Sequence, residues 1–277
     1  MASKKSTALA KSTGEAGGLV VASWMKEMAE KARNVASVFR TGVPRIIHRQ
    51  AQLMVDGQSV TGNKLPVIII EAAFEKSFYK KSFDPEEKST PDCYSFHAAD
   101  KPMAEAHVEM VPNPACAAKQ SDTCSSCPHN RFGTAAPRET GGKPGKGKRC
   151  ADHVRLLCIS PNNNKGSLLK AQVRLFSVPA NSLGNWGAYV GQLADMGMLP
   201  QMVITEISCA AVPPPGQGYK ITFNPVSSIS EEQYREIASM QERAIQTLTM
   251  PYPTLGAAEE ADPEVEKRNA KRRAKVR

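Results

Sequence analysis

The residues of this 277-residue chain that are best suited to chemistry are five cysteines at positions 93–150. Cys124 and Cys127 are separated by two residues, a spacing at which two thiolates can bind one tetrahedral ion while the backbone turns between them. Cys150 adds a third thiol downstream. Thiolates form closed structural zinc sites, whereas catalytic zinc keeps an open position and usually has histidine or carboxylate ligands. The spacing therefore predicts one structural Zn²⁺ per chain, bound by Cys124, Cys127, Cys150 and a fourth residue.

The pattern leaves the fourth ligand open. Cys93 follows Pro91 in a polar stretch that suggests an ordered turn rather than a core strand, and we favour it; Cys116 is the alternative. Three histidines are further candidates: His97, His107 and His129. Cys158 and Cys209 lie in apolar strand contexts and are expected to be small buried hydrophobes. Seven cysteines without a secretory signal argue against a disulfide framework.

A glycine-rich basic loop joins Cys127 to Cys150. Residues 142–148 match the G-x-x-x-x-G-K frame of a phosphate-binding loop, but Arg149 stands where the Mg²⁺-binding Ser or Thr should be, so nucleotide hydrolysis is not expected. Cations beside an aromatic residue are typical of single-strand binding, in which bases stack on the ring. The alternative is a solvated glycine loop. The expected nucleic-acid contacts here are Arg131, Phe132, Lys143, Lys146, Lys148 and Arg149.

A second stretch, Phe78, Tyr79, Lys80 and Lys81, also interleaves aromatic and basic residues. It is a candidate DNA contact, and the alternative is a strand end with its aromatics in the core. Further side chains are expected to line the same groove: Arg45, Arg49, Arg155, Arg174, Tyr94 and Phe96.

The net charge of the chain is +9, from 36 Lys and Arg against 27 Asp and Glu. This balance favours a polyanionic partner, of which nucleic acid is the commonest, although basic charge can also serve solubility alone. No apolar run approaches the ~20 residues that cross a bilayer, and no apolar segment leads to a cleavage site. A cytoplasmic protein without a membrane partner is expected. Without clustered carboxylates or a Ser/His or Cys/His arrangement, we expect no enzymatic activity.

The strands that must position these residues are expected at 44–55, 65–74, 154–160, 168–178, 202–212 and 219–223, because β-branched and leucine-rich runs end there at Pro, Gly or Asn. Helices are expected at 20–37, from residue 181 or 182 to 196, and after Ser230, which forms a capping box with Gln233. Residues 1–18 and 255–277 are expected to be disordered. The intervening body, 19–254, reads as one mainly β (α+β) domain with a zinc-binding insertion at about 82–150. A small barrel such as the oligonucleotide-binding (OB) fold fits this order, and a generic α+β domain fits nearly as well.

Several of these motifs together resemble a group of tailed-phage proteins associated with single-stranded DNA binding. The matching residues are Pro91, Cys93 and Ser95, then Cys124, Cys127, Pro128, Asn130, Phe132, Gly133 and Thr134, then 145–148 and Cys150, with Asn181, Ser182, Leu183 and Trp186 at a helix start. The resemblance implies a zinc-stabilised, OB-like nucleic-acid binder encoded by a phage and acting in a bacterial host cell. It also implies that Cys93 is a recurring position, which supports it as the fourth ligand. The basic C-terminal tail departs from the acidic tail by which such proteins often recruit replication partners.

The function expected from these observations is largely sequence-independent binding of single-stranded DNA in phage replication or recombination, with other replication or transcription proteins as further partners. The runner-up is a zinc-containing transcription regulator that binds duplex DNA or RNA polymerase. No recognition helix with base-reading polar residues stands out for that role. The oligomeric state stays open.

Overall fold

The computed structural model describes residues 43–49, 51–80, 90–136, 145–161, 167–212 and 218–252, all within one compact unit, Val43–Arg277. The expected helix at 20–37 and the terminal segments 1–18 and 255–277 lie outside these ranges. So do Lys81 and Lys143.

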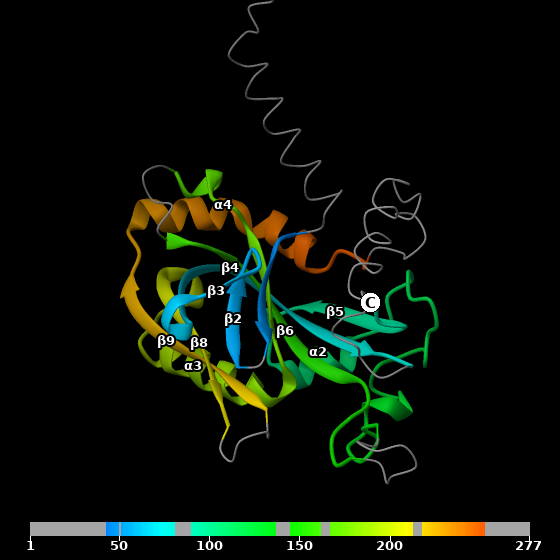
Figure 1. Ribbon diagram of the computed structural model, residues 1–277. Coiled ribbons are helices and arrows are strands. Elements are labelled where there is room, and N and C mark those ends of the chain that lie inside the picture. The colour runs from blue at the N-terminus through cyan, green and yellow to red at the C-terminus, as the bar shows by residue number, and fades with distance from the viewer. Residues whose placement is uncertain are drawn as a thin grey trace, which may run out of the picture. The chain divides into compact units, whose positions relative to one another are not determined.

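The described part of the chain is mainly β, and its strands form one sheet that curls into a half-barrel (Figure 1). The sheet order is β3-β2-β1-β7-β6-β4-β8-β9, and β5 also pairs with β4. The strands are β1 (Arg45–Arg49), β2 (Gln52–Val55), β3 (Gln58–Ser59), β4 (Lys64–Phe78), β5 (Cys93–Ala98), β6 (Ala151–Ile159), β7 (Arg174–Val178), β8 (Val203–Ala211) and β9 (Tyr219–Ser228). The β1–β7 pair is parallel and the other pairs are antiparallel.

The long strand β4 connects the half-barrel to the cysteine region, which we define as residues 90–150. Its first part, from Lys64 to Ile68, pairs with β8. After a bulge between Ile69 and Glu71, the same edge pairs with β5, while β6 runs along the opposite edge. The end of β4 therefore lies between β5 and β6, the two strands that border the cysteine region.

Two helices cover opposite faces of the sheet (Figure 1). Trp186, Tyr189 and Leu193 of α3 (Leu183–Asp195) pack in the core cluster that contains Ile69 and Phe223. Ile237, Ala244 and Leu248 of α4 (Glu231–Leu248) pack in the cluster that contains Ile68 and Leu157. Successive β4 residues point to opposite faces, so one strand serves both cores. Each fully buried aliphatic or aromatic side chain contributes about 1.5–3 kcal/mol.

The remaining helical elements are short. They are α2 (Met103–Glu109) and the 3₁₀ turns η1 (Thr61–Asn63), η2 (Pro128–Asn130), η4 (Leu168–Lys170), η5 (Ala180–Ser182) and η6 (Pro200–Met202). The predicted capping box of α4 is confirmed: the Ser230 hydroxyl accepts from the Gln233 N–H at 3.2 Å, and the Ser230 N–H donates to the Gln233 side chain at 3.0 Å.

Two strand predictions and one turn prediction need correction. The expected strand at 44–55 is the β1–β2 pair, because the chain reverses near Ala51, whose φ is +61°. The expected strand at 168–178 begins with η4, where the Glu236 carboxylate accepts from the Leu168 N–H at 2.6 Å, so only Arg174–Val178 is extended. The expected turn around Cys93 is the first residue of β5, paired with Phe78.

Candidate functional site

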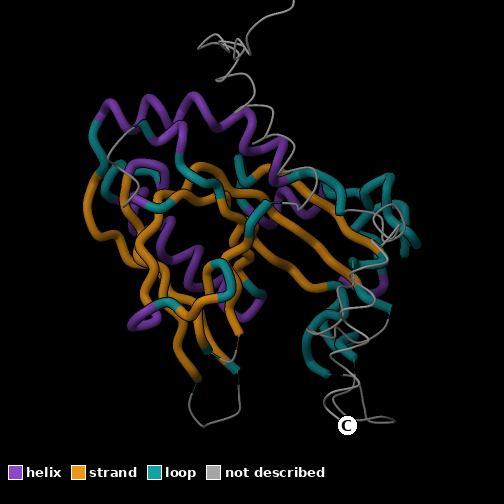
Figure 2. Tube along the Cα trace, turned by 45° about the horizontal axis from the view of Figure 1, so that its top comes forward, coloured by secondary structure: helices purple, strands orange, loops and turns teal. Residues whose placement is uncertain are grey.

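The cysteine region lies at one end of the sheet, to the right of the half-barrel in Figures 1 and 2. Sheet register brings its first and last cysteines together. Cys93 pairs with Phe78 on one edge of β4, and Ala151, which follows Cys150, pairs with Ser77 on the other edge. Neighbouring strands lie about 4.8 Å apart, so Cys93 and Cys150 flank the end of β4 although 57 positions separate them in the sequence.

The Cys124–Cys127 segment, the knuckle, is held against this strand end by backbone hydrogen bonds. The Cys124 N–H donates to the Met110 carbonyl at 3.0 Å, and the Cys150 N–H donates to the His129 carbonyl at 2.9 Å. After Cys127 the chain enters η2. The knuckle thus connects the segment that follows α2 to the start of β6.

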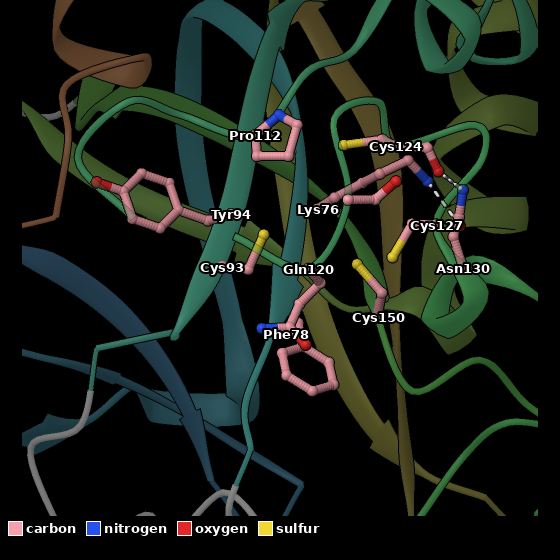
Figure 3. Close-up of a pocket in the computed structure, with 11 residues that line it drawn as sticks. Lys76, Phe78, Cys93, Tyr94, Pro112, Gln120, Cys124, Cys127, Asn130 and Cys150 are labelled. Atoms are coloured by element: carbon pink, nitrogen blue, oxygen red, sulfur yellow. Dashed lines mark hydrogen bonds between the residues drawn. The ribbon is translucent and has the colours of Figure 1, made fainter. Parts of the chain in front are cut away.

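A cavity of about 10 Å³ lies where these segments meet, and Cys93, Cys124, Cys127 and Cys150 all line it (Figure 3). This volume is close to what one water molecule occupies in a protein interior. All four cysteines are buried. In the part of the chain that the structure describes, no three Cys, His, Asp or Glu side chains already form a group that could hold a metal ion. The donor set, four thiols around a cavity of single-atom size, is nevertheless the one that structural zinc uses.

The other candidate ligands do not line this cavity. The Cys116 sulfur accepts from the Tyr94 N–H at 3.1 Å and also lies 3.2 Å from the Tyr94 carbonyl. His97 contacts Glu109 at 3.2 Å, and the His129 ring stacks on Phe78 with the ring centroids 4.4 Å apart. Cys158 and Cys209 are buried strand residues, as predicted.

A buried polar network that the sequence did not reveal adjoins the cavity. Lys76 on β4 is almost wholly buried and lies directly opposite Asp152 on β6. Its ammonium group donates to the Asp152 carboxylate at 2.5 Å and to the Asn130 side-chain oxygen at 3.0 Å. Lys148 reaches the same two groups, at 2.9 and 3.2 Å. Two cations face one carboxylate, so the network carries a net charge of 2 − 1 = +1 beside the thiols.

Asn130 links this network to the knuckle. Its side-chain N–H group donates to the Cys124 carbonyl at 2.8 Å, and its backbone N–H donates to the Cys127 carbonyl at 3.1 Å. Figure 3 shows the Asn130 amide hydrogen-bonded both to the Lys76 ammonium and to the Cys124 carbonyl. Burial acts to raise the pKa of Asp152, but the Lys76 and Lys148 ammonium groups outweigh it and hold that pKa below its ordinary value.

Burial raises the pKa of the Cys93 thiol to about 11 and that of the Cys150 thiol to about 12. Lys76 acts in the opposite direction on Cys150. Since metal-bound cysteine is a thiolate, binding of zinc would release these protons. A bound zinc with four thiolates carries a charge of about −2, and the positive network beside it offsets part of that charge.

A short hairpin projects beyond the cavity, and we call its residues 131–136 and 145–149 the tip. The Ala135 N–H donates to the Gly147 carbonyl at 2.9 Å, and the Gly145 N–H donates to the Ala135 carbonyl at 3.0 Å. Gly133 has φ +85°, a conformation that favours glycine. The Thr134 hydroxyl donates to the Arg131 carbonyl at 2.6 Å and accepts from the Arg149 N–H at 3.1 Å. These contacts give structural roles to Gly133 and Thr134, two of the residues in the resemblance to the phage proteins.

The tip presents one exposed aromatic ring. Phe132 is 80% exposed, and the Lys148 ammonium lies 5.1 Å from its centroid. Arg131 and Lys146 are exposed beside it. Lys80 is exposed at the base of the tip, where its carbonyl accepts from the Arg149 guanidinium at 2.7 Å. Four of the expected nucleic-acid contacts are therefore exposed, three in the tip and one at its base.

The other expected contacts are placed differently. Phe78 is 4% exposed, between His129 and the Arg149 guanidinium, so its ring is not open to a base and the alternative, a core aromatic at a strand end, is correct. Tyr79 is half-buried. The Lys148 ammonium contacts Asp152 and Asn130, and the Arg149 guanidinium donates to the Lys80 carbonyl, so neither side chain is free in this structure.

The broader groove predicted from sequence also needs correction. Tyr94 is buried, and Arg155 lies under aromatic rings, 4.6 Å from the Phe96 centroid. Arg174 pairs with Asp56 at 2.7 Å. Arg45 and Arg49 stay exposed on β1. A face built from Arg155, Arg174, Tyr94 and Phe96 is therefore not available, because packing and ion pairing occupy these side chains.

His107 lies beside the buried polar network, with its Nε2 atom 3.9 Å from the Asp152 carboxylate, and it makes the stability of the protein depend on pH. Burial lowers the pKa of His107 to about 4, and the nearby charge of Lys76 acts in the same direction. The unfolded chain binds a proton near the ordinary pKa of about 6.5. Between these two values the unfolded state binds more protons, so stability is complete above pH ~6.5 and falls as the pH drops toward 4.

His107→Asn should therefore flatten the pH dependence of stability. We expect the free energy of unfolding in urea to fall less between pH 7.5 and pH 5 in the variant than in the wild type. Comparing the two proteins cancels the proton uptake of the thiols, which both share. Equal losses over this pH range would assign the effect to another group.

No helix of the described residues is long and apolar enough to cross a membrane. Comparisons with protein-family models, with curated proteins and with solved structures gave no match.

Proposed function

We propose that this chain is a non-enzymatic, OB-like single-stranded DNA-binding protein whose tip contacts the DNA and whose cysteine region is held by one structural zinc. Cys93, Cys124, Cys127 and Cys150 would bind the zinc as thiolates, because they line one cavity from three separate segments. The metal would supply cross-links among these segments. The curled half-barrel is compatible with an OB-like barrel, and a phage origin rests on the motif resemblance alone.

The observation that carries the proposal is the exposed tip. The Phe132 ring is 80% exposed, and the tip and its base also expose Lys80, Arg131 and Lys146. Single-strand binders combine such rings, on which bases stack, with cations that follow the phosphate backbone. Every base has a π-face, so this arrangement predicts binding with little sequence preference. It also predicts an affinity that falls with salt, since phosphate contacts release counterions.

Phe132→Ala should weaken binding to single-stranded DNA by about 5- to 150-fold, the equivalent of the ~1–3 kcal/mol that stacking contributes per base. The measurement is fluorescence anisotropy with a labelled mixed-sequence oligonucleotide at fixed salt. Leu169→Ala is the matched control, because Leu169 is also an exposed large apolar residue, outside the cysteine region.

The same assay with duplex DNA tests the class of function. The proposal expects tight, salt-sensitive binding to the single strand and much weaker binding to the duplex. Equal affinity for the two forms would favour a duplex-binding transcription regulator. Absence of binding at low salt, or an unchanged affinity in Phe132→Ala, would contradict a role of the tip in DNA binding.

A further inference from the structure

A fifth thiol stands next to the candidate zinc site. Cys116 packs against the small cluster formed by Phe78, Cys93 and Cys150. Burial raises the pKa of the Cys93 thiol, and the neighbouring Cys116 thiol adds to that shift. A tetrahedral site takes four ligands, and Cys93, Cys124, Cys127 and Cys150 already line the cavity. Cys116 is therefore not needed as a zinc ligand, although it packs against the cluster that contains Cys93 and Cys150.

Cys116 also differs from the other four in exposure. It is only partly buried, whereas the four cavity cysteines are buried. Its sulfur is fixed by the backbone of Tyr94, the residue that follows Cys93 on β5, through an N–H donor at 3.1 Å. This contact places the Cys116 sulfur against the backbone of the residue next to Cys93. An oxidant arriving from solvent would meet Cys116 before it meets a buried ligand.

We infer that Cys93 and Cys116 form an oxidation-sensitive thiol pair that closes to a disulfide with a peroxide and so removes one ligand from the zinc site. The identity of Cys93 as a ligand rests on the proposed structural zinc. The pairing of the two thiols rests on the packing of Cys116 against the cluster that contains Cys93.

The reaction proceeds in two balanced steps with hydrogen peroxide as the oxidant. The Cys116 sulfur attacks one peroxide oxygen, the O–O bond breaks, and the departing hydroxide takes up the thiol proton to leave as water, which gives a sulfenic acid. The Cys93 sulfur then attacks the Cys116 sulfur, the S–S bond forms, and the S–O bond breaks to release a second water after protonation. The two thiols lose two electrons in total and the peroxide gains two.

Closing the pair leaves three thiolates at the cavity: Cys124, Cys127 and Cys150. A site with three of its four protein ligands is expected to bind zinc more weakly. The Cys93 side chain would then be bonded to Cys116 rather than to the metal, and the zinc cross-link between β5 and the knuckle would be lost. Reduction of the disulfide would restore the fourth ligand.

The test treats the zinc-loaded full-length chain with a small excess of hydrogen peroxide and follows zinc release with a chromogenic chelator. The disulfide is mapped by mass spectrometry after cleavage at glutamate and with trypsin, since Glu105 and Glu109 separate Cys93 from Cys116 and Lys119 separates Cys116 from Cys124. We expect a Cys93–Cys116 disulfide and zinc release that a thiol reductant reverses. Cys116→Ser should slow the release at least about tenfold, because direct oxidation of buried ligands is all that remains. Cys209→Ser, which alters a buried strand cysteine, should leave the rate unchanged.

Each outcome decides a separate point. A disulfide between Cys124 and Cys127 instead, or release from Cys116→Ser at the wild-type rate, would overturn the inference while leaving the structural zinc intact. A protein purified without zinc would refute the proposed metal site. In that case the mapped disulfide alone decides the inference: formation of Cys93–Cys116 supports the pair, and its absence overturns it.

Discussion

Cys150→Ser is expected to abolish zinc binding and to unfold the cysteine region while the half-barrel stays folded. Ala106, Met110 and Cys124 pack into the core of the half-barrel, and the rest of residues 90–150 has little apolar core of its own. The cluster at the end of β4 contains only Phe78, Cys93 and Cys150 as buried members among the described residues. Such a core cannot offset the ordering entropy of a segment this long, which amounts to about 1–2 kcal/mol per residue. Structural zinc contributes on the order of 10 kcal/mol to the folding of small domains, so loss of a ligand should be decisive here.

Two measurements check this expectation. Elemental analysis should give about one zinc per wild-type chain, the stoichiometry of a single tetrahedral site, and almost none in Cys150→Ser. Limited trypsin digestion should cut the variant rapidly at the basic residues of the tip, while fragments of the half-barrel persist. The half-barrel has its own cores against α3 and α4, which do not contain Cys150.

The matched control is Cys209→Ser. Cys209 is buried on β8, in the core cluster with Phe223, and does not line the cavity. This variant should keep its zinc and its resistance to trypsin in the tip, although a buried hydroxyl in an apolar core lowers overall stability by about 1–3 kcal/mol. A Cys150→Ser protein that retains a full complement of zinc would show that the metal is bound outside this cavity.

The sequence was sufficient for features that local chemistry determines. The C-x2-C spacing identified the knuckle, and Cys93, Cys124, Cys127 and Cys150 do line one cavity. The α4 capping box and the buried Cys158 and Cys209 follow from neighbouring residues alone. Asn130, Gly133 and Thr134 were recognised only as members of a motif, and their contacts now explain why these residue types stand there.

The sequence was insufficient where long-range pairing decides the outcome. The chain reverses near Ala51, a residue with positive φ where no Gly or Asn announces a turn. Phe78, close to Lys80 and Lys81, and Tyr94 look like groove aromatics in the sequence, but both are buried at the paired strands β4 and β5. Lys76 and Asp152 are 76 positions apart, and only the β4–β6 register shows that they face each other. The sequence did offer one indication of a buried cation: Lys76 lies between Phe74 and Phe78, which share its face of the strand.

Lys76→Met is expected to lower the free energy of unfolding by about 3 kcal/mol. Removing one partner of a buried ion pair costs ~3–5 kcal/mol because the other charge stays in a poorly solvated site. Asp152 keeps Lys148 as a partner, 2.9 Å away, which places the effect at the lower end of that range. The measurement is urea unfolding at pH 7.5. Lys64→Met is the control, because Lys64 forms an exposed pair with Glu206 at 3.1 Å and should change stability by less than ~1 kcal/mol.

The same substitution should weaken zinc binding, and a double variant separates the two effects of Lys76. In the wild type, Lys76 and Lys148 against Asp152 give 2 − 1 = +1 beside the thiolates. Lys76→Met alone gives 1 − 1 = 0, and Lys76→Met combined with Asp152→Asn gives 1 − 0 = +1 again.

If this positive charge stabilises the thiolates, zinc affinity should fall in the single variant and recover in the double variant. The free energy of unfolding should recover in part, since the buried Asp152 carboxylate is gone, while the half-buried Lys148 loses that ion pair and keeps the Asn130 oxygen at 3.2 Å. A double variant that regains stability but not zinc affinity would assign Lys76 to the fold of β4 and β6 alone. Recovery of both would show that the ammonium is matched to the charge of the metal site.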